Sequence, residues 1–89
     1  MSTDRPEPVD GLDIHEVEDG LVVYDPAADR VHYLNPSASI VLSLCDGSRT
    51  EAELAELVRA AWKLEVAPVG EVRDCIAHLR REGVLRDQP

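Results

Sequence analysis

The sequence predicts an α+β fold, in which a small antiparallel sheet comes first and α-helices follow. Residues 12–35 contain three β-prone runs separated by Gly, Asp and Pro residues that favour turns. Residues 35–82 instead repeat apolar residues at spacings of three and four, with helix-capping residues ahead of the repeats. Because the two patterns occupy separate parts of the chain, the sheet and the helices are expected to form separate layers.

Three strands are expected in the first half of the chain. The first begins at Leu12 and alternates loosely over LDIHEVE. Asp19-Gly20 follows, and a pair that tolerates positive φ predicts a two-residue hairpin turn. The second strand is LVVYD, residues 21–25, after which Pro26 presets φ for another turn. RVHYLN, residues 30–35, is the third strand, and such short connections predict an antiparallel meander.

The first helix is expected to begin after Asn35. Asparagine is a good N-cap, and Pro36 fits the first helical position, where its missing N–H is not needed. Gly47 is expected to close this helix in a left-handed cap. The apolar stripe of the helix is Ile40, Val41, Leu44 and Cys45, with Ala38 and Leu42 beside it.

The second helix has a capping box at its start, made by Thr50 and Glu53. Its apolar stripe is predicted to be Leu54, Leu57, Val58, Ala61 and Trp62. Val66-Ala67-Pro68 then interrupts the helical pattern. A third helix is expected from about Val69 to Glu82, with Val69, Val72, Cys75, Ile76 and Leu79 on one face. Gly83 ends it, and Val84-Leu85 is expected to pack back.

Three short helices beside a small sheet predict a winged-helix-like domain, here with its three strands ahead of the helices. The 89 residues are enough for one small domain. Residues 1–10 are polar and Pro-rich and are expected to form a flexible tail, which leaves residues 11–86 as the domain. A core of this size leaves little room for a deep catalytic cavity, so a groove or a sheet edge is the natural binding feature.

The composition limits the partners of the chain. The core must be aliphatic, because the chain has no Phe, one Trp and two Tyr. A formal charge of −9 disfavours both nucleic acids and anionic membrane surfaces, since affinity for phosphates depends on Lys and Arg. No apolar run approaches the length of a membrane span, and the acidic N-terminus does not resemble a secretory signal. We therefore expect a cytoplasmic protein.

The chain offers no pattern typical of an enzyme. His15, His32 and His78 share no short spacing, and Cys75 with His78 forms only one pair of potential metal ligands, so no metal site or cofactor is predicted. No serine lies in a G-x-S-x-G turn. Cys45 and Cys75 fall in apolar helical patterns and are expected to be buried, reduced thiols. No catalytic residue is predicted.

DNA binding is an alternative for a winged-helix-like domain. It requires a recognition helix with basic or amide side chains on one exposed face. The third helix is the only candidate, through Arg73, Arg80 and Arg81, but acidic residues lie between them. The sequence favours a solvated helix face here, and a winged-helix transcriptional regulator stays as the second hypothesis.

The free edge of the sheet is the stronger candidate site. The outer strands of a three-stranded meander each leave one row of backbone N–H and C=O groups unpaired. The third strand, residues 30–34, is β-prone, and a guest peptide could add to it through main-chain hydrogen bonds. Covering of this edge by the N-terminal tail or by a second copy of the chain is the alternative.

The ordered set of motifs resembles the PqqD-like family of peptide-binding modules, the RiPP recognition elements. The resemblance rests on YLNPSASIVLSLCDGSRTEAEL and on DCIAHLRREGVL, and it covers roughly Leu12 to Leu85. It implies a non-catalytic module that binds the leader segment of a ribosomally made precursor peptide. The module presents this peptide to a modifying enzyme such as a radical SAM enzyme, a cyclodehydratase or a leader peptidase.

The resemblance also implies where the leader lies. It adds as a strand beside the third strand, in a groove with the third helix as its wall. In this chain the strand residues are Arg30, Val31, His32, Tyr33 and Leu34. The wall residues are Val72, Cys75, Ile76, Leu79 and Arg80, less those that the core requires. Val31 and Leu34 have opposite parity along the strand, so the sequence leaves open which face of the strand lines the groove.

Several properties of the partner stay open at this stage. The acidic balance favours a basic leader or a basic docking surface on the enzyme, whereas Arg73 and Arg80 would select an acidic leader. With few aromatic anchors, an affinity of order micromolar or somewhat better is expected. The free protein is expected to be a monomer or a strand-paired homodimer. A third hypothesis is a subunit whose edge pairs only with an enzyme and never with a peptide.

Overall fold

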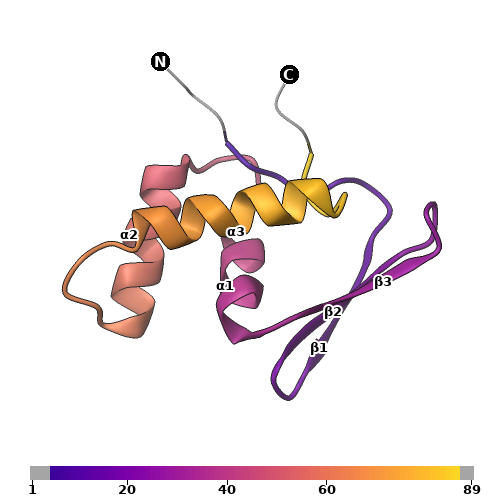
Figure 1. Cartoon of the computed structure of the whole chain (residues 1–89), viewed down its shortest axis with the longest axis horizontal. Helices are drawn as coiled ribbons and strands as arrows, with labels where there is room; N and C mark the ends of the chain where they lie inside the picture. The colour runs from indigo at the N-terminus through magenta and orange to yellow at the C-terminus, as the bar shows by residue number, and fades with distance from the viewer. Residues whose placement is uncertain (1–4, 87–89) are drawn as a thin grey trace.

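The computed structural model describes residues 5–86 and confirms the α+β fold. Within those residues, a three-stranded antiparallel sheet is followed by three α-helices. The strands are β1 (Asp13–Val17), β2 (Gly20–Asp25) and β3 (Arg30–Leu34). The helices are α1 (Pro36–Leu44), α2 (Glu51–Trp62) and α3 (Val69–Arg81). Figure 1 shows the sheet extending to one side of the helices, with α3 lying across α1.

The sheet has the order β1-β2-β3, so β1 and β3 are its edges. The first hairpin turn consists of Glu18 and Asp19, one residue earlier than the predicted Asp19-Gly20. Gly20 is instead the first residue of β2, and its φ of 151° is one that glycine adopts readily. A Cβ at this position would collide with the carbonyl oxygen of Leu34. The glycine is therefore needed for the close approach of β2 to the end of β3.

Residues opposite each other across the ladder project to the same face of the sheet. Leu21 lies opposite Leu34, and Val23 lies opposite His32, and all four face the helices. Val31 and Tyr33, which alternate with these residues along β3, project to the opposite face of the sheet and are 66% and 58% exposed. The face that the sequence left open is thus resolved: His32 and Leu34 point toward the helices, and Val31 and Tyr33 point away.

The predicted helix starts are confirmed. The Asn35 side chain accepts a hydrogen bond of 2.9 Å from the Ala38 N–H, and Pro36 occupies the first helical position. Thr50 and Glu53 form the reciprocal capping box of α2. Gly47 has a left-handed φ of 84°, but it lies beyond the end of α1, whose C-cap is Cys45. The expected left-handed cap at Gly47 is therefore wrong.

The core contains aliphatic side chains from the sheet, the three helices and Val84-Leu85. In α2 only the start of the predicted stripe is buried, since Leu57 and Trp62 are 38% and 41% exposed. Ala55, which the stripe omitted, is fully buried, because α2 packs on α1 and α3 along a face that begins at Leu54 and ends at Val58. Val69 of α3 is likewise exposed, contrary to prediction.

The N-terminal segment is placed differently from the expected flexible tail. Pro6 is buried, and Pro8 forms a bridge with Leu85. The Val9 N–H donates to the Val84 carbonyl at 3.0 Å, and the Arg86 N–H donates to the Glu7 carbonyl at 2.9 Å. The expectation is corrected for residues 5–10, because these backbone bonds join them to the C-terminal segment. Residues 1–4 lie outside the described residues.

Both cysteines are free, as predicted. Cys45 is buried, and its burial raises the pKa of the thiol to about 12. Cys75 is only half-buried, although both thiols were expected to be buried, and burial raises its pKa as well. Neither thiol is poised to act as a nucleophile near neutral pH. Among residues 5–86, no helix has the length and apolarity that a membrane crossing demands.

Candidate functional site

The hydrogen-bonding direction of β3 follows from the first hairpin. Val17 and Gly20 flank the two-residue turn, so they form a hydrogen-bonded pair between β1 and β2. Along an antiparallel strand, the backbone N–H and C=O groups of successive residues point alternately to one side of the strand and to the other. The next residue of β2, Leu21, therefore bonds to the neighbour on its other side, which is β3. Val23 does the same.

The partners of these two residues on β3 are Leu34 and His32. Their backbone groups thus point inward, toward β2. The backbone groups between and beside them, those of Val31 and Tyr33, point outward to the edge of the sheet. The Leu34 carbonyl oxygen lies against Gly20, which agrees with this alternation. The edge of β3 consequently offers the N–H and C=O groups of two residues.

Nothing within residues 5–86 covers this edge with hydrogen bonds. The backbone bonds made outside the helices and strands do not involve Val31 or Tyr33. The N-terminal segment, which was one candidate cover, bonds instead to the C-terminal segment at Val84 and Arg86. The outward groups of β3 therefore have the arrangement that an added strand uses.

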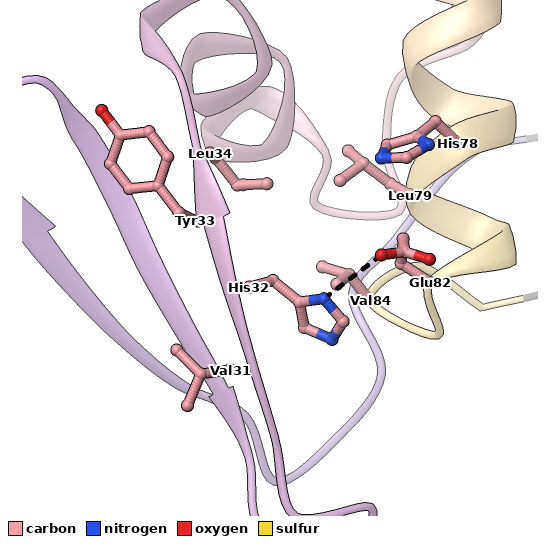
Figure 2. A pocket seen from close by; sticks show the side chains of 8 residues that line it. All are labelled: Val31, His32, Tyr33, Leu34, His78, Leu79, Glu82 and Val84. Atoms are coloured by element: carbon pink, nitrogen blue, oxygen red, sulfur yellow. Dashed lines mark ion pairs between the residues drawn. The ribbon is translucent and has the colours of Figure 1, made fainter.

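The edge faces α3 across an open cleft of about 180 Å³. Figure 2 shows β3 on one side of the cleft and the C-terminal half of α3 on the other, with His32 and Leu34 pointing toward the helix. The lining residues come from β3, from α3 and from the segment after it: Val31, His32, Tyr33, Leu34, His78, Leu79, Glu82 and Val84. The cleft thus combines the unpaired strand edge with a mixed polar and apolar wall.

One polar pair crosses the cleft. The Nδ1 atom of His32 lies 3.6 Å from the Oε1 atom of Glu82 (Figure 2). The side chain of His32 is only 9% exposed, whereas that of Glu82 is 40% exposed. The other ring nitrogen of His32, Nε2, is buried and has no hydrogen-bond partner among the described residues. A buried polar atom without a partner costs about 1–3 kcal/mol, so a group that reached this nitrogen would be bound favourably.

The structure brings only part of the predicted helix wall to this cleft. Leu79 lines it, but Ile76 is fully buried in the core, and the Nε atom of Arg80 donates to the Arg86 carbonyl at 3.0 Å. Val72 and Cys75 line a different cleft, between the helices. Arg30 is exposed at the start of β3 and does not line the cleft.

Sequence reasoning missed His78, Glu82 and Val84. The two α3 residues lie three and seven positions after Cys75, on the same helical stripe, so helical spacing from Cys75 was a usable signal. The wall that the resemblance implied was mainly apolar and did not include these polar side chains. Val84 follows α3 and reaches the cleft only because the chain folds back after Gly83.

The cleft presents hydrogen-bonding, charged and apolar groups. Within residues 5–86, no group of three or more His, Cys, Asp or Glu side chains is placed to hold a metal ion. The cleft residues supply backbone donors and acceptors, two imidazoles, one carboxylate and apolar side chains. The unpaired backbone groups repeat along a line, which matches the repeat of an extended chain better than the shape of a compact small molecule.

Comparison with protein families gives one relevant match. The family model described as coenzyme PQQ synthesis protein D (PqqD) matches residues 20–85. The match begins at the start of β2 and ends at the core residue Leu85, so it contains β3, α3 and the cleft between them. Comparisons with curated proteins and with solved structures give no match.

Proposed function

Because the chain belongs to the PqqD family, we propose that it captures the leader segment of a ribosomally made precursor peptide and presents it to a modifying enzyme. The family itself indicates a peptide-binding partner in biosynthesis. The observation that carries the finer proposal is the pair of outward-facing backbone residues, Val31 and Tyr33, beside the cleft with α3. The leader adds to β3 as a fourth strand.

Strand addition has a clear physical basis at this edge. The guest supplies carbonyls and N–H groups for Val31 and Tyr33, and each such net hydrogen bond contributes about 0.5–1.5 kcal/mol. Its alternate side chains point into the cleft, where they meet Leu34, Leu79 and Val84. A few strand bonds and a small cleft favour an affinity of order micromolar or somewhat better.

The polar pair in the cleft contributes selectivity. A hydroxyl or amide side chain of the leader is expected to reach the unpartnered Nε2 atom of His32. Glu82, the carboxylate in the cleft lining, favours a basic side chain nearby. Arg80, which would have selected an acidic leader, donates to the Arg86 carbonyl and does not line the cleft. The structure thus supports a neutral or basic leader over an acidic one.

The chain acts in this proposal as a carrier, and the chemistry belongs to its enzyme partner, a radical SAM maturase or a leader peptidase. Residues 11–86 form the binding domain, and the N-terminal segment, residues 5–10, hydrogen-bonds to it at Val84 and Arg86. The uncovered β3 edge also predicts a strand-paired homodimer as a competing state at high protein concentration. Leader binding is expected to dissolve that dimer.

The proposal is tested with a random peptide library of fixed length, displayed and selected on the immobilised protein. The strongest binder is synthesised and titrated into isotope-labelled protein while backbone amide shifts are recorded. We expect the largest changes at Val31 and Tyr33, with further changes at His78 and Glu82. Binding should weaken only mildly with added salt, unlike the steep salt dependence of DNA binding. A failure to select any binder, or shifts confined to other parts of the chain, would refute strand addition at β3.

A further inference from the structure

A second cleft lies between the helices. It has a volume of about 360 Å³ and, unlike the first, contains no residue of the sheet. Its lining is mainly apolar and comes from the three helices and the α2–α3 connection: Ser37, Val41, Val58, Trp62, Leu64, Pro68, Glu71, Val72 and Cys75. Trp62, the last residue of α2, is 41% exposed beside it. The cleft is large enough to receive an aliphatic or aromatic side chain.

The two clefts share one stripe of α3. The cleft between the helices, called here the helical cleft, is lined by residues 71, 72 and 75 of α3. The cleft between β3 and α3, called the strand cleft, is lined by residues 78, 79 and 82, which continue the same spacing of three and four. The two groups are centred about two turns apart, which is about 10 Å along the helix at 1.5 Å per residue. An extended peptide covers that distance in about three residues.

The order of the chain links the two clefts on the other side as well. β3 ends at Leu34, which lines the strand cleft, and α1 follows at once, with Ser37 in its first turn lining the helical cleft. A guest that lies along β3 and continues past Leu34 therefore arrives at the first turn of α1. The next apolar surface that it meets beside α3 is the helical cleft.

We propose that the guest peptide anchors an aliphatic or aromatic side chain in this helical cleft, about three residues N-terminal to the segment that pairs with β3. This inference rests on the function proposed above and adds a recognition element to it. In this proposal the guest continues the antiparallel order of the sheet, in which both strand pairs are antiparallel. A guest antiparallel to β3 has its N-terminal end over Leu34 and α1.

The lining selects the kind of anchor. Val41, Val58 and Val72 are nearly fully buried and form the floor, so a polar side chain would lose its hydration without gaining a partner there. Glu71, the charged residue in the lining, repels an acidic anchor. Trp62 provides an exposed aromatic wall, a residue type that often dominates binding energy at interfaces.

The test uses peptides selected from a random display library of fixed length. We expect them to share an apolar position at a constant offset before the strand segment. Trp62→Ala should lower the affinity of the best peptide by about tenfold. Leu57→Ala is the matched control, because Leu57 is an exposed apolar residue of the same helix but lines a separate cleft with Arg49, Glu53 and Glu56. It should leave the affinity unchanged.

Alanine replacement of the anchor in the peptide supplies the second half of a double-mutant cycle. If the anchor contacts Trp62, the peptide change and Trp62→Ala are not additive. A further readout needs no protein variant and compares the two peptides on the wild-type protein. Cys75 is half-buried and lines the helical cleft. In alkaline buffer, where more of this thiol is ionised, the bound peptide should slow its alkylation by iodoacetamide, whereas the anchor-to-alanine peptide should not.

The outcomes separate this inference from the proposed function. Val31→Pro tests the strand and Trp62→Ala tests the anchor. Peptides that are sensitive to Val31→Pro, lack a shared apolar position and ignore Trp62→Ala would overturn the anchor and leave strand addition intact. Peptides insensitive to Val31→Pro would overturn strand addition and, with it, the anchor as part of the same guest. A dimer that Trp62→Ala dissociates without peptide present would assign the cleft to a second copy and also overturn the inference.

Discussion

Replacing Val31 with proline removes one outward-facing N–H group from β3. Proline is tolerated on an edge strand where its nitrogen faces away from the ladder. The hydrogen bonds that join β2 and β3 involve the backbone of Arg30, His32 and Leu34, so Val31→Pro leaves them in place. The side chain of Val31 is 66% exposed on the outer face of the sheet, and its loss removes little packing. The folded protein should therefore survive the substitution.

The expected loss of affinity can be worked from one backbone bond. The guest carbonyl opposite Val31 loses its donor, and the proline ring occupies the space next to it. A carbonyl left without a partner in a cleft costs about 1–3 kcal/mol, which is about a five- to 150-fold weaker affinity. Val31→Ala is the matched control, since it trims the side chain and keeps the N–H. It should bind the peptide as the unaltered protein does.

Calorimetric titration of the selected peptide measures these affinities, and thermal unfolding checks each variant. Both variants should unfold within about 5 °C of the unaltered protein, which corresponds to about 1 kcal/mol for a domain of this size. Two results would show the reasoning to be wrong. One is a folded Val31→Pro protein that keeps full affinity; the other is an equal loss in Val31→Ala, which would assign binding to the outer face of the sheet.

Three further predictions concern stability and reactivity. Gly20→Ala should lower the free energy of unfolding by about 2 kcal/mol or more in urea titrations, because of its positive φ and the collision with the last carbonyl of β3, whereas Gly70→Ala, with open space around it, should not destabilise the fold. Hydrogen bonds from the Thr50 backbone and side chain lower the pKa of Glu53. This carboxylate therefore stabilises the fold above its unfolded pKa, and that contribution is lost as the pH falls through the lowered folded value. In urea titrations, the difference in free energy of unfolding between the unaltered protein and Glu53→Gln should shrink in acid, and a constant difference would contradict the capping role. Cys45, with its pKa raised to about 12, should resist iodoacetamide in the folded protein and react after denaturation, as mass spectrometry would show; rapid labelling without unfolding would contradict its burial.

The sequence by itself determined the features that depend on neighbours in the chain. Two helices start through hydrogen bonds that span three residues, at Asn35 ahead of Pro36 and at Thr50 with Glu53. Their capping role could therefore be predicted from spacing alone. The order of strands and helices followed from hydrophobic periodicity for the same reason. The position of β3 as an edge strand was also predictable, because a meander with short connections places its third strand outermost.

The helix wall of the site required the tertiary structure. His32 and Glu82 are far apart in the sequence, and they meet only because α3 crosses beside the end of the sheet. The α3 stripe is divided between two clefts because β3 lies beside its C-terminal half and α1 and α2 lie beside its N-terminal half, which periodicity does not report. The resemblance offered Ile76 as a wall residue unless the core required it, and the packed helices bury it fully.

The burial of individual side chains and the residues of the helix wall could not be predicted from the sequence, for one physical reason. Local hydrogen bonds and φ preferences act over a few residues, so capping and strand order are encoded where they occur. Exposure instead depends on which distant segment packs against a side chain. Pro6 is buried where its carbonyl accepts from the Gly47 N–H, whereas Trp62 stays 41% exposed. Which backbone groups of β3 remain open to a guest was therefore decided by the hairpin register and by the docking of the N-terminal segment at the C-terminal one, away from that edge.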